Sequence, residues 1–138
     1  MKKILLITLL SIFINTTYAC GKRPISYTMR EDGSKYGLFI SEETIKKSKQ
    51  WAPSMGEPPL SVSSAYNRVI TWVKGKYKRY DKVIINEITL KKYRCTGIKN
   101  HWYYQMNITP VIEGNELYGL RESTAVLMNG EVIGHKKY

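Results

Sequence analysis

The sequence predicts an α+β domain in which one main helix packs on a four-stranded antiparallel meander. Apolar residues recur every three or four positions over residues 62–77, as they do on one face of a helix. Beyond Asp81 the period changes to alternation, and β-branched and aromatic residues dominate. Short turn signals, Gly114-Asn115 and Asn129-Gly130, separate the last predicted strands, so neighbouring strands should pair antiparallel.

The first nineteen residues have the pattern of an export signal. Lys2 and Lys3 give a positive start, residues 4–14 form an uncharged apolar run, and Ala19 ends a small-x-small cleavage site. This run is shorter than the roughly 20 residues that a membrane-spanning helix needs. We therefore expect residues 1–19 to be removed as a signal peptide, which would leave a periplasmic or secreted protein.

Cys20 directly follows the predicted cleavage site, and Cys95 is the only other cysteine. Cleavage by the ordinary signal peptidase would leave Cys20 available for a disulfide with Cys95 in an oxidising compartment. Cleavage by a lipoprotein peptidase would instead leave a lipidated Cys20 and anchor the protein to a membrane. In a third alternative, both thiols stay reduced. The sequence leaves these three states open.

The chain after the leader divides into two parts. Residues 20–60 are predicted to form an N-terminal extended segment and loop, because residues 21–34 are polar and have no sustained period. Within this part, residues 36–40 favour a short strand, Ser41 favours the start of a brief helix, and the prolines after Trp51 favour an irregular loop. Residues 61–138 are predicted to form the α+β domain.

The predicted elements of this domain follow from local patterns. Ser61 can cap the main helix, whose apolar face consists of Val62, Ala65, Tyr66, Val69, Ile70, Val73 and Tyr77. Strands are predicted over residues 82–93, 101–112, 116–128 and 131–136. We expect the helix to cover one face of the sheet and water to contact the other.

Several short runs carry a resemblance to known proteins. They are Trp51, Pro58-Pro59-Leu60-Ser61, Ala65, Trp102-Tyr103-Tyr104 and residues 126–132. With these runs the chain resembles, over about two thirds of its length, small exported bacterial proteins of unassigned activity, and its element order resembles cystatin-like and PepSY-type domains. The resemblance implies a non-catalytic binding module or, as an alternative, a peptidase inhibitor or modulator. The Gln-x-Val-x-Gly inhibitor loop of true cystatins does not occur.

The composition is strongly basic. The chain has 22 Lys and Arg against 11 Asp and Glu, and loss of Lys2 and Lys3 with the leader lowers the net charge from +11 to about +9. Such a charge favours anionic polymers and lipid surfaces, such as phosphorylated glycolipid, acidic glycan or anionic lipid. A surplus of lysine can also serve solubility alone.

Two surfaces are candidates for binding. The first is a basic stretch in which cations would steer an anionic ligand and a tyrosine ring could stack on it: Lys74, Lys76, Tyr77, Lys78, Arg79 and Lys82. An ordinary solvated helix end gives the same pattern. The second is a row on the outer face of the sheet, which consists of Tyr103, Gln105, Asn107 and Thr109.

Motifs for catalysis or metal binding do not occur. His101 and His135 have no companion at metal-ligand spacing, and no nucleophile, phosphate-loop or dinucleotide motif is present. We therefore expect no catalytic residue, no metal ligand and no cofactor. A small hydrolase that uses Cys95 or the Glu113 region is the enzymatic alternative. The sequence favours a non-catalytic exported binding module whose partner is an envelope component or another exported protein, and it indicates no specific nucleic acid and no particular oligomeric state.

Overall fold

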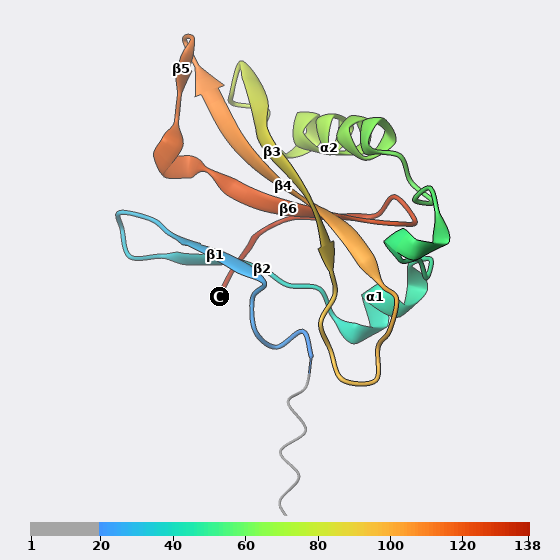
Figure 1. Cartoon of the computed structure of the whole chain (residues 1–138). Coiled ribbons are helices and arrows are strands. Elements are labelled where there is room, and N and C mark those ends of the chain that lie inside the picture. Colours follow the sequence, from blue (N-terminus) through green and yellow to red (C-terminus); the bar gives the residue numbers. More distant parts are fainter. Residues whose placement is uncertain (1–19) are drawn as a thin grey trace, which may run out of the picture.

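The computed structural model describes residues 20–138, and the predicted signal peptide lies outside them. The fold is α+β, with one main helix and two antiparallel sheets (Figure 1). The larger sheet has five strands in the order β3-β4-β6-β7, with β5 paired to β4, and the smaller sheet has the order β1-β2-β8. None of the helices in residues 20–138 has the length and apolar composition that a bilayer-spanning helix requires.

The main helix, α2 (Val62–Lys76), forms where its caps and apolar face predict it. The Ser61 hydroxyl accepts a hydrogen bond from the backbone N–H of Ser64 at 3.2 Å, which satisfies one of the free amides of the first turn. Ala65, Val69 and Val73 are buried against the central sheet in a core with Tyr104, Met106, Ile108, Val126 and Met128. The predicted contact between this helix and the sheet is therefore confirmed.

The two long strands of the larger sheet are also confirmed, as β3 (Lys82–Lys92) and β4 (Trp102–Ile112). They pair antiparallel along their whole length, with a register shift between Ile85 and Glu87. The shift leaves Asn86 without a partner, which is a β-bulge. The bulge explains the blurred alternation of β3, because Val83, Ile85 and Ile88 all pack on the helix-facing core.

The predicted third and fourth strands are wrong in their bounds. The third is divided into β5 (Asn115–Glu116), a short 3-10 helix (Tyr118–Leu120) and β6 (Glu122–Leu127). The fourth is divided into β7 (Val132–Ile133), which pairs with β6, and β8 (Lys136–Lys137), which pairs with β2 of the smaller sheet. The change of sheet falls at Gly134, where a Cβ atom would lie 2.4 Å from the Trp72 ring.

Residues 20–60 are not the mainly extended segment that the sequence predicts. They form β1 (Ser26–Met29), β2 (Lys35–Leu38), α1 (Glu42–Lys47) and a 3-10 turn (Pro53–Met55). The predicted short strand and the helix capped by Ser41 are present. The β1–β2 hairpin, however, belongs to the folded domain, because β1 and β2 pack against β6.

A second core therefore lies on the face of the larger sheet that was predicted to meet water. Leu38, Ile40 and Ile45 from the N-terminal elements pack there with Tyr103, Ala125 and Leu127 from the sheet. Figure 1 shows the hairpin and α2 on either side of the sheet. The physical reason is that β4 and β6 carry apolar side chains at successive positions, so both faces require cover.

Candidate functional site

The predicted basic stretch, residues 74–82, spans the end of α2 and the start of β3. Lys74, Lys78 and Lys82 are exposed. The Arg79 guanidinium donates to the Tyr80 hydroxyl at 2.6 Å and lies over the ring of the same tyrosine. These four cations lie at the surface, as predicted for a basic stretch.

Lys76 and Tyr77 have a different role, because both contact the buried carboxylate of Glu122. The Tyr77 hydroxyl donates to Glu122 Oε2 at 2.5 Å, and Lys76 Nζ lies 3.4 Å from the same oxygen. Arg30 donates to Glu122 Oε1 at 2.7 Å from the hairpin side. Burial of Tyr77 and its hydrogen bond to Glu122 raise the pKa of the Tyr77 hydroxyl, which therefore remains a donor. These contacts join the helix, the hairpin and the sheet.

Three of the four residues in the second predicted surface, the row on the outer face of β4, are buried. Tyr103 and Thr109 are at most 2% exposed and Gln105 is 9% exposed, and the N-terminal elements pack on this face against Tyr103. Burial raises the pKa of the Tyr103 hydroxyl to about 12. These three residues are not available to a partner, whereas Asn107 is partly exposed and donates to Glu87 Oε2 at 2.7 Å.

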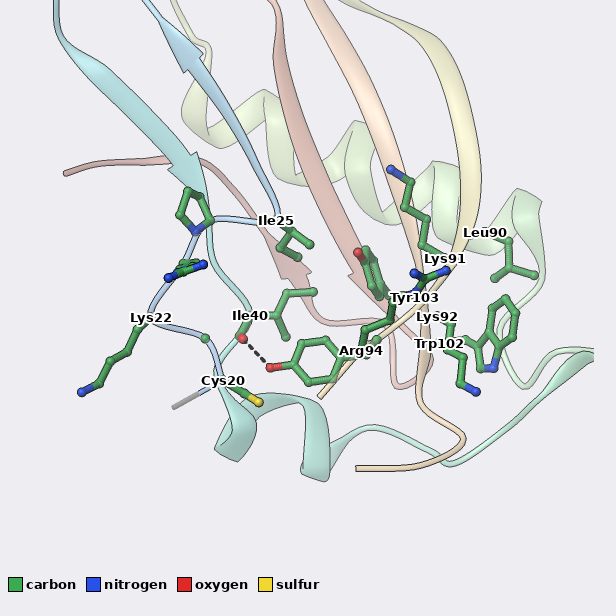
Figure 2. A pocket seen from close by; sticks show the side chains of 14 residues that line it. Cys20, Lys22, Ile25, Ile40, Leu90, Lys91, Lys92, Arg94, Trp102 and Tyr103 are labelled. Carbon is green, nitrogen blue, oxygen red and sulfur yellow. Dashed lines mark hydrogen bonds between the residues drawn. The ribbon is translucent and has the colours of Figure 1, made fainter. Parts of the chain in front are cut away.

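The structure instead forms a groove of about 900 Å³ that the sequence analysis did not identify. It lies between the segment Cys20–Ile25 and the carboxyl end of β3. Figure 2 shows Lys91, Lys92 and Arg94 at the strand end; Lys22 lies on the opposite wall, and its ammonium group points outward from that wall. Arg23 also lines the groove, and among residues 20–138 no Asp or Glu does.

The two walls of the groove are joined covalently. A disulfide connects Cys20 to Cys95, with 5.9 Å between the two Cα atoms. Lipidation of Cys20 would need the same sulfur atom, so the bridge and the lipid exclude each other. Next to the bridge, Gly21 has a φ of +87° and passes so close to α1 that a Cβ atom would lie 2.8 Å from Ser41 Cα. The first wall is therefore held at a defined position.

Aromatic and apolar side chains form the floor of the groove. Tyr93 is 7% exposed, and its hydroxyl donates to the Ile40 carbonyl oxygen at 3.0 Å, which links the floor to the N-terminal wall (Figure 2). Burial, with a smaller contribution from Glu42, raises the pKa of Tyr93. Trp102 packs edge-on against Trp51, with 6.1 Å between the ring centroids. Leu90 and Ile25 add partly exposed apolar surface.

This arrangement favours an anionic ligand with some apolar surface. Five cations line one concave site that has no carboxylate among its lining residues in the described range 20–138, and such a site concentrates anions by long-range attraction. The aromatic floor offers contact area that a purely solvated cluster of lysines does not provide.

A sequence signal for the groove existed in the basic pairs beside the two cysteines. Lys22-Arg23 follows Cys20 closely, and Lys91-Lys92 and Arg94 precede Cys95. A Cys20–Cys95 bridge brings the two groups together across 75 positions of chain. Because the bridge is only one of the three states that the sequence allows for Cys20, the sequence alone does not predict that the two basic groups lie together.

The cysteine considered for catalysis forms the disulfide, and both histidines lie buried in the fold. Cys95 is in the disulfide, so it is not a thiolate nucleophile in this state. His101 is buried with its Nδ1 2.9 Å from the Lys99 carbonyl oxygen, and His135 is buried beside the Ser26 hydroxyl. Within residues 20–138, Cys20, Cys95 and Glu42 bring their ligand atoms within 4.8 Å of one another, but both sulfurs are consumed by the bridge.

Comparison of the chain with protein-family models, with curated proteins and with solved structures finds no match.

Proposed function

We propose that this protein is an exported, non-catalytic binding module that holds an anionic ligand in the groove between Cys20–Ile25 and the end of β3. The ligand would be part of an envelope component or of another exported protein. The observation that carries the proposal is the gathering of Lys22, Arg23, Lys91, Lys92 and Arg94 around one concave site whose lining, in the part of the chain that the structure describes, contains no carboxylate.

Two further features support binding over a purely solubilising role for these cations. The aromatic floor is rigid, because Tyr93 and Trp102 are held by a hydrogen bond to Ile40 and by ring packing on Trp51. The disulfide keeps the two charged walls together before any ligand arrives, so less conformational entropy is lost on binding.

The proposal is tested with two triple variants that remove the same charge. Lys91→Ala/Lys92→Ala/Arg94→Ala removes three groove cations, and Lys74→Ala/Lys78→Ala/Lys82→Ala removes three exposed cations outside the groove. The probe is a heparin oligosaccharide, a soluble polyanion, titrated by calorimetry at low and at high salt.

We expect the groove variant to bind at least about tenfold more weakly, whereas the control changes within about threefold. Binding to the unmodified protein should weaken as salt rises, because the contacts are largely electrostatic. Equal losses in both variants would show that total charge and not the groove governs binding. No binding by the unmodified protein would refute the proposal.

A further inference from the structure

The carboxyl end of β3, which forms one wall of the groove, is also an open strand edge. β3 lies at the end of the strand order of the larger sheet, and in residues 20–138 its only strand partner is β4. An edge strand of this kind carries backbone N–H and C=O groups that can pair with another extended chain.

The hydrogen-bond pattern shows which residues offer these groups. Tyr93 donates its backbone N–H to the His101 carbonyl oxygen at 2.8 Å, so Tyr93 faces β4. In an antiparallel pair the direction alternates along the strand, so the backbone groups of Lys91 also face β4. The backbone groups of Leu90 and Lys92 therefore point to the open side, where the groove lies.

The cations of the groove lie on both sides of this edge. The register places Lys91 beside Tyr103 and Lys92 beside Trp102, and these two partners point to opposite faces of the sheet. An extended chain along the edge would thus meet a cation above and a cation below its own backbone. Leu90 pairs with Tyr104, so its side chain shares the face of Lys92 and Trp102, and this face offers apolar contact beside the cation.

We propose that the ligand of the groove is an acidic, extended peptide segment of another exported protein, which adds to the free edge of β3 as a further strand. This inference rests on the proposed function and names its ligand class. Main-chain pairing would supply affinity, and the cations and apolar positions would select alternating acidic and apolar side chains.

The charge of the edge also indicates what the partner is not. Lys82, Lys91 and Lys92 lie on β3, so pairing of this edge with the same edge of a second copy would place lysines against lysines. Lysines on an edge strand commonly prevent such self-association. The same charges that repel a second copy attract an acidic chain.

The test on the unmodified protein uses a capped eight-residue peptide of alternating Glu and Val and two N-methylated derivatives of it. One derivative is N-methylated at the four Glu residues and the other at the four Val residues, so each blocks the N–H groups of one edge and keeps the charge. We expect the parent peptide to bind, and one derivative to lose at least about tenfold in affinity while the other keeps most of it. Equal binding of all three peptides would overturn the strand-pairing proposal.

A matched pair of variants tests the protein side. Leu90→Pro removes an outward N–H without removing a ladder hydrogen bond, and Leu90→Ala keeps that N–H. Because both variants remove the same apolar side chain from the groove, they are compared with each other, and we expect Leu90→Pro to bind the parent peptide at least about tenfold more weakly than Leu90→Ala. The two variants should bind the heparin oligosaccharide equally, which shows that the proline leaves the cationic groove intact.

The two probes separate failure of this inference from failure of the proposed function. Heparin binding with no binding of the parent peptide, or with equal peptide binding by Leu90→Pro and Leu90→Ala, would refute the peptide partner and leave an anion-binding groove. Absence of binding to both probes would refute both.

Discussion

Glu122 shows at the scale of single residues why two of the predicted binding residues have a different role. A carboxylate with 5% exposure needs partners, and Arg30, Lys76 and Tyr77 supply them. These partners lie between 45 and 92 positions away along the chain. The local sequence around Lys76 and Tyr77 contains no information on this carboxylate, so it indicated a basic surface.

His135 lies close to the same network and gives a prediction about pH. Its Nε2 lies 3.3 Å from the Ser26 hydroxyl, and the charged groups that act on it are Glu122, Lys76 and Arg30. Burial lowers the pKa of His135 below its ordinary value of 6.5; Glu122 opposes this shift, and Lys76 and Arg30 add to it. The folded protein therefore binds the His135 proton only at lower pH than the unfolded chain does.

The sign of the effect on stability follows from this difference. Below about pH 6.5 the unfolded chain takes up the proton first, so the free energy of unfolding falls as the pH decreases toward the folded pKa of His135. Urea denaturation at pH 7.5, 6.5 and 5.5 should show this fall, and His135→Gln should reduce it. The same slope in both proteins would contradict the assignment.

At the scale of elements, the helix and the long strands agree with their sequence patterns, and the smaller elements depend on their neighbours. The Ser61 cap and the spacing of Ala65, Val69 and Val73 define α2 within a few residues. The two-residue strands β7 and β8 have no comparable local signal, since each exists only because a partner strand lies beside it. This is why the single predicted strand 131–136 was wrong.

The N-terminal hairpin provides a prediction at this scale. Leu38 is fully buried in the second core, so Leu38→Ala should lower the free energy of unfolding by about 2–5 kcal/mol. Met29→Ala on the same hairpin is a control, because Met29 is 63% exposed and its loss should change stability within about 0.5 kcal/mol. Urea denaturation measures both. Similar small effects of the two substitutions would mean that the hairpin is not part of the core.

At the scale of the whole molecule, the helix, the larger sheet and the N-terminal hairpin form successive layers with a core on each face of the sheet. The Cys20–Cys95 bridge joins the start of the described chain to the segment after β3. The bridge restricts the unfolded chain, and in the folded protein it holds the first wall of the groove in place.

Loss of the bridge should therefore change stability and binding together. With 75 positions between the cysteines, the loop-closure model gives a loss of about 4.5 kcal/mol for Cys20→Ser/Cys95→Ser. Thermal unfolding of the double variant, and of the unmodified protein with and without reductant, measures this effect. We also expect weaker heparin binding, because the segment Cys20–Ile25 loses its covalent attachment. Unchanged stability on reduction would show that the bridge contributes nothing to the fold.

The sequence by itself determined the main helix, the two long strands and the tight turn at Asn129-Gly130, because caps, periodicity and turn residues act over a few neighbouring positions. Only the tertiary structure decided that the second face of the sheet is buried, that Lys76 and Tyr77 contact Glu122, and that the cations near Cys20 and Cys95 share one groove. Each of these features depends on residues far apart in the chain, whose contact is set by the packing of the layers as a whole.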